Sequence, residues 1–250
     1  KVVSESWYTD PLTGETHEPE PGDNVLLTLD VKLQAKAEQV LADTISSLES
    51  ADTGGGAVVI QDVSDGGVLT MASYPTYDLA TVYSDQALYA QVSSDPLEPF
   101  YNRASMGLYS PGSTFKPLVG IAALEEGVTT PSETIRDTGR FTLPEEEKYP
   151  YGDFHPQCWI YRQYGGTHGQ ENLADALRDS CNIYFYTIGH RLGIERIDLY
   201  AKMFGLGEKT GFELSESKGR VAGPATSEAL NMTWYGGNLL NAAIGQDNTQ

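Results

Sequence analysis

The sequence predicts an α+β fold, because helical and hairpin patterns follow one another along it. Apolar residues repeat at helical spacing in residues 31–50, and the next run, 57–72, has the strand composition and central Gly-Gly turn of a β-hairpin. Helical patterns return at 113–126, 172–189 and 194–204. A chain of 250 residues can form one large domain or two small ones.

The charge balance and the cysteine count limit the possible functions. Thirty-five acidic residues against 16 basic ones give a net charge of −19, so we expect no nucleic-acid partner. Solubility is the simplest explanation of this acidity. Two cysteines form neither a disulfide scaffold nor a repeated CxxC metal framework.

Neither a membrane span nor a signal peptide is visible in the sequence. No apolar run approaches the ~18 residues that a span requires. Because the sequence begins at Lys1 without a methionine, we expect a piece of a longer protein, with any membrane anchor upstream.

The first elements follow in order. Residues 1–24 are polar and rich in Pro and Gly, so we expect a lead-in or linker. The apolar run 25–29 predicts a short strand, and Asp30 is a suitable N-cap for the helix at 31–50. The apolar positions of that helix are Leu33, Ala37, Val40, Leu41 and Ile45.

Two longer stretches lack a clear period. Residues 76–99 are polar and are expected at the surface. Residues 128–169 contain many aromatic residues, Pro and Gly, and long excursions of this kind often carry function.

A candidate nucleophile lies where a Pro111-Gly112 turn enters an apolar helix. Ser113 and Lys116 are three positions apart, so they share one helix face. A serine hydroxyl attacks poorly unless a neighbouring base takes its proton, and a lysine can be that base if burial lowers its pKa. The helix N-terminus adds N–H groups where an oxyanion would form. We expect this helix to be buried and to end at Gly127.

A second motif, Ser180-Cys181-Asn182, lies downstream within the helical pattern at 172–189. Taken alone, it indicates a Ser/Asn break between two helices. The order Ser-x-x-Lys and then Ser-x-Asn is more informative, because class A β-lactamases and penicillin-binding proteins share it together with a later Lys-Thr-Gly.

The two motifs and their surroundings resemble the transpeptidase domain of class B, monofunctional penicillin-binding proteins, of the type that serves cell elongation or sporulation. The resemblance spans nearly the whole chain. β-Lactamases have different sequences between the two motifs, so the penicillin-binding proteins are the better match. The further segments that carry it are 22–30, the hairpin ending at Tyr74-Pro75, Asn102-Arg103-Ala104, 109–116, Cys158-Trp159, His168-Gly169, 180–186, 204–207 with Thr210-Gly211, and Ile244-Gly245-Gln246.

The resemblance implies a fold, a location and partners. The fold is an antiparallel sheet of five strands flanked by helices. The location is the extracytoplasmic face of the bacterial cell membrane, with the anchor outside this chain. The partners are peptidoglycan stem peptides, β-lactam antibiotics and a membrane glycosyltransferase, and neither a cofactor nor a metal is expected.

The resemblance also implies roles for four residues. Ser113 attacks the penultimate D-Ala carbonyl of a stem peptide and forms an acyl-enzyme, and β-lactams acylate the same serine. Lys116 accepts the proton of Ser113, and Ser180 relays a proton to the leaving amine. Asn182 binds the substrate amide and steadies Lys116, while the backbone N–H of Ser113 supplies half of the oxyanion hole. An amine from a neighbouring stem peptide then takes the acyl group, which forms the cross-link.

The third motif departs from the family pattern. The residues Lys209-Thr210-Gly211 have the sequence of the Lys-Thr-Gly motif. The resemblance, however, aligns this segment with a Gly-Leu-Gly-x-x-Thr-Gly stretch of the family and puts the true third motif beyond residue 250. We therefore expect residues 25–250 to be an incomplete transpeptidase domain with exposed sheet edges. The second oxyanion donor would also be missing, which would cost about 3 kcal/mol and impair this piece as a catalyst.

Some alternatives stay open. Asp153, His155, Cys158 and His168 suggest a zinc site, but their spacing fits no standard pattern, and an inert loop is favoured. Cys158 and Cys181 are expected to be free thiols, although an oxidising compartment would allow a disulfide. Four aromatic residues either line a peptide groove or, as we favour, pack the long loop; they are Tyr151, Trp159, Tyr161 and Tyr164.

Two other functions remain possible for the same motifs. A D,D-carboxypeptidase differs only in using water as the acceptor. A non-catalytic sensor or scaffold could keep the fold, and the intact motifs argue against it.

Overall fold

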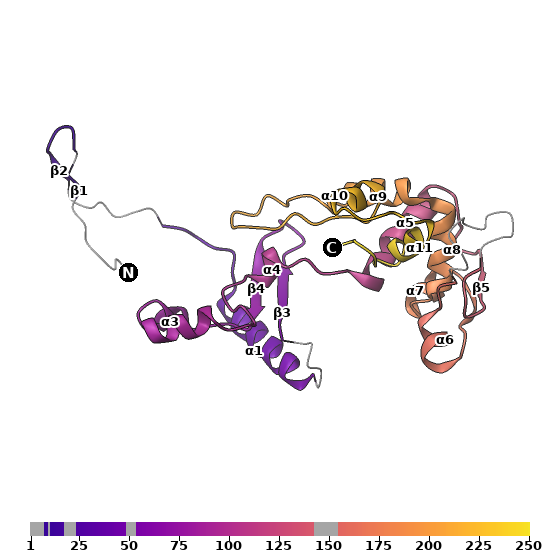
Figure 1. Cartoon of the computed structure of the whole chain (residues 1–250), viewed down its shortest axis with the longest axis horizontal. Helices are drawn as coiled ribbons and strands as arrows, with labels where there is room; N and C mark the ends of the chain where they lie inside the picture. Colours follow the sequence, from indigo (N-terminus) through magenta and orange to yellow (C-terminus); the bar gives the residue numbers. More distant parts are fainter. Residues whose placement is uncertain (1–7, 10, 18–23, 49–53, 143–154) are drawn as a thin grey trace. The chain divides into compact units, whose positions relative to one another are not determined.

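A computed structural model describes residues 8–9, 11–17, 24–48, 54–142 and 155–250 of the chain (Figure 1). The chain divides into two compact units, Lys1–Pro99 and Phe100–Gln250. At its start, β1 (Tyr8–Thr9) pairs with β2 (Thr16–His17) in a short antiparallel ribbon.

The first unit is built on the predicted helix and hairpin. Helix α1 (Val31–Ser47) begins at Asp30, whose carboxylate accepts hydrogen bonds from the N–H groups of the next turn, as expected. Strands β3 (Gly56–Gln61) and β4 (Val68–Tyr74) form an antiparallel hairpin, and α1 packs against it (Figure 1). Ala37 and Leu41 of the helix bury themselves against Ala72 of β4.

The predicted strand at 25–29 is wrong. Val25 and Leu26 are 82% and 97% exposed, and no ladder forms along them. Only the end of the segment reaches β4, where Thr28 Oγ1 donates to the Val68 carbonyl and Asp30 N to the Leu69 carbonyl. A strand needs a partner along its length, and this segment has one only at its end.

The polar segment at 76–99 contains two short helices that the sequence analysis did not predict. They are α2 (Leu79–Val82) and α3 (Gln86–Ser93), and the carboxylates of Asp78 and Asp85 cap them. Aspartate N-caps thus start each of the three helices found in the described residues of this unit.

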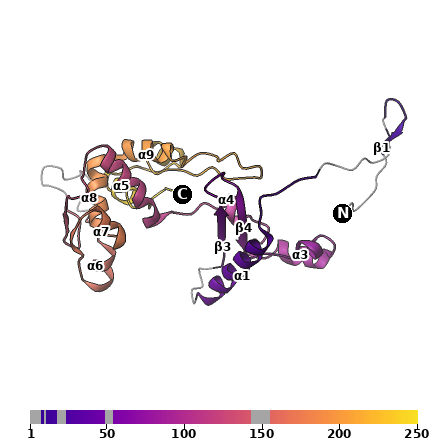
Figure 2. The same cartoon turned by 180° about the vertical axis from the view of Figure 1, so that it is seen from behind.

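The second unit is organised around one buried helix. After α4 (Arg103–Met106), a 3₁₀ turn, η1 (Gly112–Phe115), leads into α5 (Lys116–Glu125). Helix α5 packs against α7 (Leu173–Arg178), α8 (Asn182–Leu192) and α9 (Ile194–Met203) (Figure 2). Its buried apolar side chains include Val119, Ala122 and Ala123, and Gly127 follows it at φ +64, which confirms the predicted helix end.

The remaining elements complete the frame of this unit. Strand β5 (Ile135–Asp137) pairs antiparallel with β6 (Gly169–Glu171), and α6 (Trp159–Tyr164) lies between them in sequence. The helical pattern at 172–189 is broken into α7 and α8 by residues 179–181. Helices α10 (Pro224–Ala229) and α11 (Gly236–Ala242) follow, and α11 packs on α8.

Mixed helices and antiparallel strands confirm the predicted α+β class. Within the described residues the strands form three separate two-stranded sheets. None of the described helices is long and apolar enough to cross a membrane.

The segment around Lys209-Thr210-Gly211 does not form a strand. Its backbone is irregular, and the Glu216 carboxylate accepts hydrogen bonds from Thr210 N, Thr210 Oγ1 and Gly211 N.

Candidate active site

The turn that carries Ser113 is fixed by a residue far away in the sequence. Gly112 has φ +55, which favours glycine, and its N–H donates to the carbonyl of Gly245 at 2.8 Å. Phe115 is buried beneath the turn. Ser113 therefore stands at the start of a rigid turn that enters a buried helix.

Lys116 is a buried cationic side chain of the second unit. Its residue is only 1% exposed, and its Nζ donates to Asn182 Oδ1 at 2.7 Å, to the Ser180 carbonyl at 2.8 Å and to Ser180 Oγ at 2.9 Å. No carboxylate is among these partners. Burial lowers the pKa of Lys116 to about 8, although the thiols of Cys158 and Cys181 act in the opposite direction.

The three hydroxyl and amine groups form one hydrogen-bonded chain. Ser180 Oγ donates to Ser113 Oγ at 2.8 Å and accepts from Lys116 Nζ. The lysine thus reaches Ser113 through Ser180, whereas the sequence analysis expected Lys116 to accept the proton of Ser113 directly. All four predicted site residues lie together, since Asn182 completes the group at Lys116.

The turn between α7 and α8 holds Ser180 and Asn182 in place. Ser180 has φ +53, an uncommon conformation for a residue other than glycine. The indole Nε1 of Trp159 donates to the Asp179 carbonyl at 3.1 Å, and Asn182 N donates to Cys158 Sγ at 3.3 Å. The sequence analysis did not assign these supporting roles to Trp159 and Cys158, because they depend on contacts between segments about 20 residues apart.

Comparisons with the sequences and structures of known proteins identify the family of this chain. Residues 56–250 match the model of the penicillin binding protein transpeptidase domain. The chain belongs to this transpeptidase family. Peptidoglycan D,D-transpeptidase MrdA of Escherichia coli K12 is 34% identical over 235 residues, which cover 91% of this chain and 34% of that protein. Stage V sporulation protein D of Bacillus subtilis is 32% identical over 198 residues, which cover 78% of this chain and 27% of that protein.

Solved structures agree with this family and its class B, PBP2-like branch. Pseudomonas aeruginosa PBP2 in complex with WCK 5153 matches with a TM-score of 0.77 and 32% identity, over 92% of this chain and 49% of that one. Helicobacter pylori PBP2 in complex with MreC has a TM-score of 0.77 and 28% identity, over 97% of this chain and 43% of that one. The chain spans about a third of the length of the curated relatives and about half of the solved chains.

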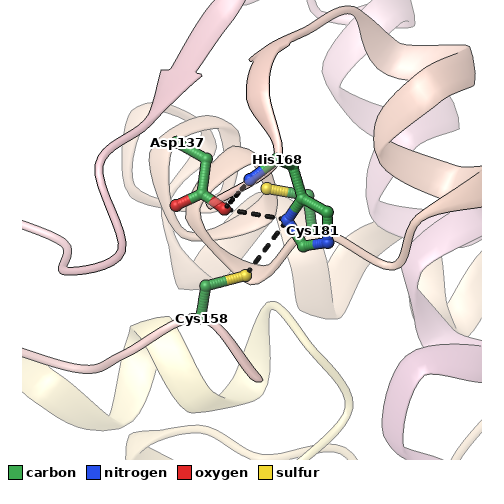
Figure 3. A group of neighbouring side chains, drawn as sticks. All are labelled: Asp137, Cys158, His168 and Cys181. Carbon is green, nitrogen blue, oxygen red and sulfur yellow. Dashed lines mark hydrogen bonds and ion pairs between the residues drawn. The ribbon is translucent and has the colours of Figure 1, made fainter. Parts of the chain in front are cut away.

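A second cluster lies directly behind the transpeptidase motifs. The ligand-type atoms of Asp137, Cys158, His168 and Cys181 all lie within 4.8 Å of one another (Figure 3). His168 Nδ1 is 2.8 Å from Asp137 Oδ2 and 3.5 Å from Cys158 Sγ. Both thiols are free and buried, as the sequence analysis favoured. Cys181 stands between Ser180 and Asn182, so the cluster shares a turn with the transpeptidase motif.

The electrostatics of the cluster suit a cation. Burial would raise the pKa of the Asp137 carboxyl, but hydrogen bonds from the N–H groups of His168 and Gly139 and from the His168 ring lower it overall. Interaction with the Cys181 thiol lowers the pKa of Cys158, and this pairing and burial raise the pKa of Cys181. Two sulfurs, one imidazole and one carboxylate are a donor set that Zn²⁺ accepts.

The four residues considered for zinc from the sequence match this cluster only in part. Cys158 and His168 belong to the cluster, but His155 Nδ1 lies 3.1 Å from the Phe141 carbonyl oxygen, and Asp153 and Tyr151 lie outside the described residues. Asp137 and Cys181 take the other two places.

The sequence analysis expected no metal, whereas the donor set of this cluster predicts about one zinc ion per chain, which metal analysis of the purified protein would detect. His168→Ala removes the imidazole, and we expect zinc affinity to fall by more than tenfold. His155→Ala is the matched control, because it removes a neighbouring histidine outside the cluster. Equal zinc content in both variants would contradict the assignment.

Proposed function

We propose that this chain is the acylating part of a peptidoglycan D,D-transpeptidase. One observation carries the proposal: the hydrogen-bonded chain from buried Lys116 through Ser180 to Ser113. A serine linked to a lysine that is neutral in an appreciable fraction of molecules at neutral pH has the arrangement of an activated nucleophile. The names of the relatives support this reaction class.

The mechanism starts from neutral Lys116, and in that state the two hydrogen bonds reverse: Ser113 Oγ donates to Ser180 Oγ, and Ser180 Oγ donates to Lys116 Nζ. Neutral Lys116 draws a proton from Ser180 Oγ as Ser180 takes the proton of Ser113, so Ser113 Oγ can attack the penultimate D-Ala carbonyl. The tetrahedral oxyanion forms beside the backbone N–H of Ser113. The proton returns through Ser180 to the leaving amine, and the terminal D-Ala departs to leave an ester on Ser113. Asn182 binds the substrate amide through the part of its side chain that Lys116 does not use.

The acyl-enzyme determines the further chemistry. The amine of a second stem peptide attacks the ester, which makes the cross-link and frees Ser113 Oγ. A β-lactam carbonyl is attacked in the same way, but the opened ring stays attached to the carbonyl, so no amine departs. We therefore propose that β-lactams acylate Ser113 and remain there.

The proposed location and partners follow from the family. Two relatives of known structure belong to larger assemblies. One is the H. pylori PBP2–MreC complex, and the other is a peptidoglycan synthase complex that coordinates polymerization and crosslinking. These names support partners among the cell-wall proteins. From the family resemblance we propose a place at the extracytoplasmic face of the membrane, beside a glycosyltransferase.

The acceptor decides between transpeptidase and carboxypeptidase. The test incubates the protein with a stem pentapeptide that carries a free amine, and products are identified by mass. We expect a cross-linked dimer and released D-Ala, and no product with Ser113→Ala. Tetrapeptide alone would indicate water as the acceptor, and no release of D-Ala by either protein would favour the scaffold alternative.

A further inference from the structure

The two thiols of the cluster behind the transpeptidase motifs form a pair of their own. Cys158 Sγ and Cys181 Sγ lie within 4.8 Å of each other, and neither is in a disulfide (Figure 3). They belong to the only two cysteines of the chain. Cys158 immediately precedes α6 and Cys181 immediately precedes α8, so the fold and not the local sequence brings these two sulfurs together.

Both thiols are tied to the turn that holds the second transpeptidase motif. Cys181 stands between Ser180 and Asn182, whose side chains accept hydrogen bonds from Lys116 Nζ. Cys158 reaches the same turn, because its Sγ accepts a hydrogen bond from Asn182 N at 3.3 Å. A new covalent bond at either sulfur therefore acts directly on the residues that hold Lys116.

The distance between the two sulfurs suits a disulfide. A disulfide bond brings its sulfurs to about 2.05 Å and needs Cβ atoms that already lie close together. Sulfurs that start within 4.8 Å can reach this distance by rotation of the side chains and a small shift of the backbone.

Burial of the pair limits which oxidants can reach it. Both cysteines are 0% exposed, and of their neighbours the Asp137 side chain is 0% and the His168 side chain 6% exposed. The cluster thus lies just beneath the surface at His168. A protein oxidase or a glutathione molecule is too large to reach a sulfur in this position. Hydrogen peroxide is little larger than water and oxidises cysteine, so it is the oxidant that fits.

One molecule of peroxide is enough to make the bond. The first thiol attacks the peroxide, so that an S–O bond forms, the O–O bond breaks, and a sulfenic acid and one water result. The second thiol attacks the sulfenic sulfur, so that the S–S bond forms, the S–O bond breaks, and a second water leaves. The two thiols lose two electrons and two protons, and the peroxide is reduced to water. A zinc ion held by these sulfurs would be released, because a disulfide offers no thiolate.

We propose that Cys158 and Cys181 are a modification site for hydrogen peroxide, and that the disulfide formed there switches off acylation at Ser113. The effect on acylation rests on the proposed function. The formation of the bond does not, and it is measured separately.

The effect on acylation follows from the position of Cys181 within the turn. Trp159 Nε1 holds the start of the turn through the Asp179 carbonyl at 3.1 Å. The turn is therefore fixed on one side of Cys181, and a pull on this residue moves Ser180 and Asn182. A misplacement of about 1 Å in a catalytic group can lower a rate about 10²-fold.

The first test measures the bond itself. Purified protein is treated with hydrogen peroxide, and its mass is recorded without a reductant. We expect the loss of two hydrogen atoms, and we expect peptide mapping to join the peptides that contain Cys158 and Cys181. Because the chain has no third cysteine, no other disulfide can form within it. A protein that keeps both thiols, or that only gains oxygen on them, would overturn the inference.

The second test links the bond to acylation. The rate of acylation by benzylpenicillin is measured before peroxide treatment, after it, and again after reduction with dithiothreitol. We expect the rate to fall about 10²-fold on oxidation and to return on reduction. An unchanged rate in protein that carries the disulfide would overturn the switch.

Two serine variants separate the disulfide from other oxidation. Cys158→Ser keeps an acceptor near Asn182 N but cannot form the bond, and Cys181→Ser removes the other partner. Each variant is compared with its own untreated sample, and circular dichroism establishes that it is folded. Peroxide should leave the acylation rate of each variant unchanged. A fall as large as in wild type would mean that another oxidised residue is responsible, and the inference would be wrong.

Reversal by dithiothreitol keeps the test decisive if neither variant folds. Dithiothreitol reduces a disulfide, whereas methionine sulfoxide requires its own reductases. A loss of acylation that dithiothreitol does not reverse would therefore contradict the switch. Untreated wild-type protein reports on acylation of Ser113 alone, so failure of the switch and failure of the proposed function can be told apart.

Discussion

Lys116→Met is expected to lower the rate of acylation by benzylpenicillin about 10²–10⁴-fold, the range for loss of a general base. Methionine fills a similar volume but cannot accept the proton that Ser180 passes on from Ser113. The rate is measured by mass spectrometry at a fixed penicillin concentration. Lys202→Met is the matched control, because Lys202 lies on α9 and pairs with Asp198. A rate within twofold of wild type would mean that Lys116 is not the base.

The lowered pKa of Lys116 also predicts how the acylation rate depends on pH. With a pKa lowered to about 8 by burial, its neutral fraction rises about tenfold between pH 7 and 9, and the wild-type acylation rate should rise with it.

Stability should also depend on pH through Lys116. Its pKa in the folded state lies below the ordinary 10.5 of a free lysine. Below about pH 8 both states are protonated, and the cost of the buried charge is fully present. From pH 8 to about 10.5 the unfolded chain binds the extra proton, so folding gains stability as pH rises. The Tm difference between wild type and Lys116→Met should shift in favour of wild type over this window.

Gly245→Ala is expected to destabilise the protein by about 2–4 kcal/mol. Gly245 has φ +69, and an added Cβ would lie 2.2 Å from the Gly112 carbonyl oxygen and 2.6 Å from Phe115 Cβ. The strained conformation costs about 1 kcal/mol and overpacking another 1–3 kcal/mol. Because Gly245 O also accepts from Gly112 N, relief of the clash must move the Ser113 turn. Acylation should therefore fall about 10²-fold in molecules that still fold.

Gly127→Ala is the matched control for that change. Gly127 has φ +64, but an added Cβ would meet nothing within 4 Å, so only the cost of the backbone conformation applies. Thermal unfolding should rank wild type, Gly127→Ala and Gly245→Ala in falling order of Tm, with acylation lost only in the last. Equal losses for the two variants would mean that Gly245 makes no special contact with the turn.

Local patterns predicted those parts of the chain that depend on neighbours in sequence. Residues within a few positions of one another determine helix α1, its Asp30 cap, the β3–β4 hairpin and the end of α5 just before Gly127. The four candidate site residues were found because each motif is short. Their distances were not predictable, because Lys116 and Ser180 are 64 positions apart.

Long-range register explains what the sequence analysis missed. Asp137 pairs with Gly169 across β5 and β6, so the register of this ladder brings it next to His168. No spacing rule links residues 137, 158, 168 and 181, and the cluster becomes visible only in the folded chain. The strand predicted at 25–29 is wrong for the same reason: whether a ladder partner lies beside these apolar residues depends on the folded chain, and none runs along them.

The central claim is that Ser113 is an activated nucleophile, and the mass of the protein after incubation with benzylpenicillin tests it most directly. The account predicts one penicilloyl group per chain, located on Ser113 by peptide mapping and absent from Ser113→Ala. An adduct on another residue, or one that survives the Ser113→Ala change, would contradict it. So would an unmodified protein after prolonged incubation at pH 9, where Lys116 is mostly neutral.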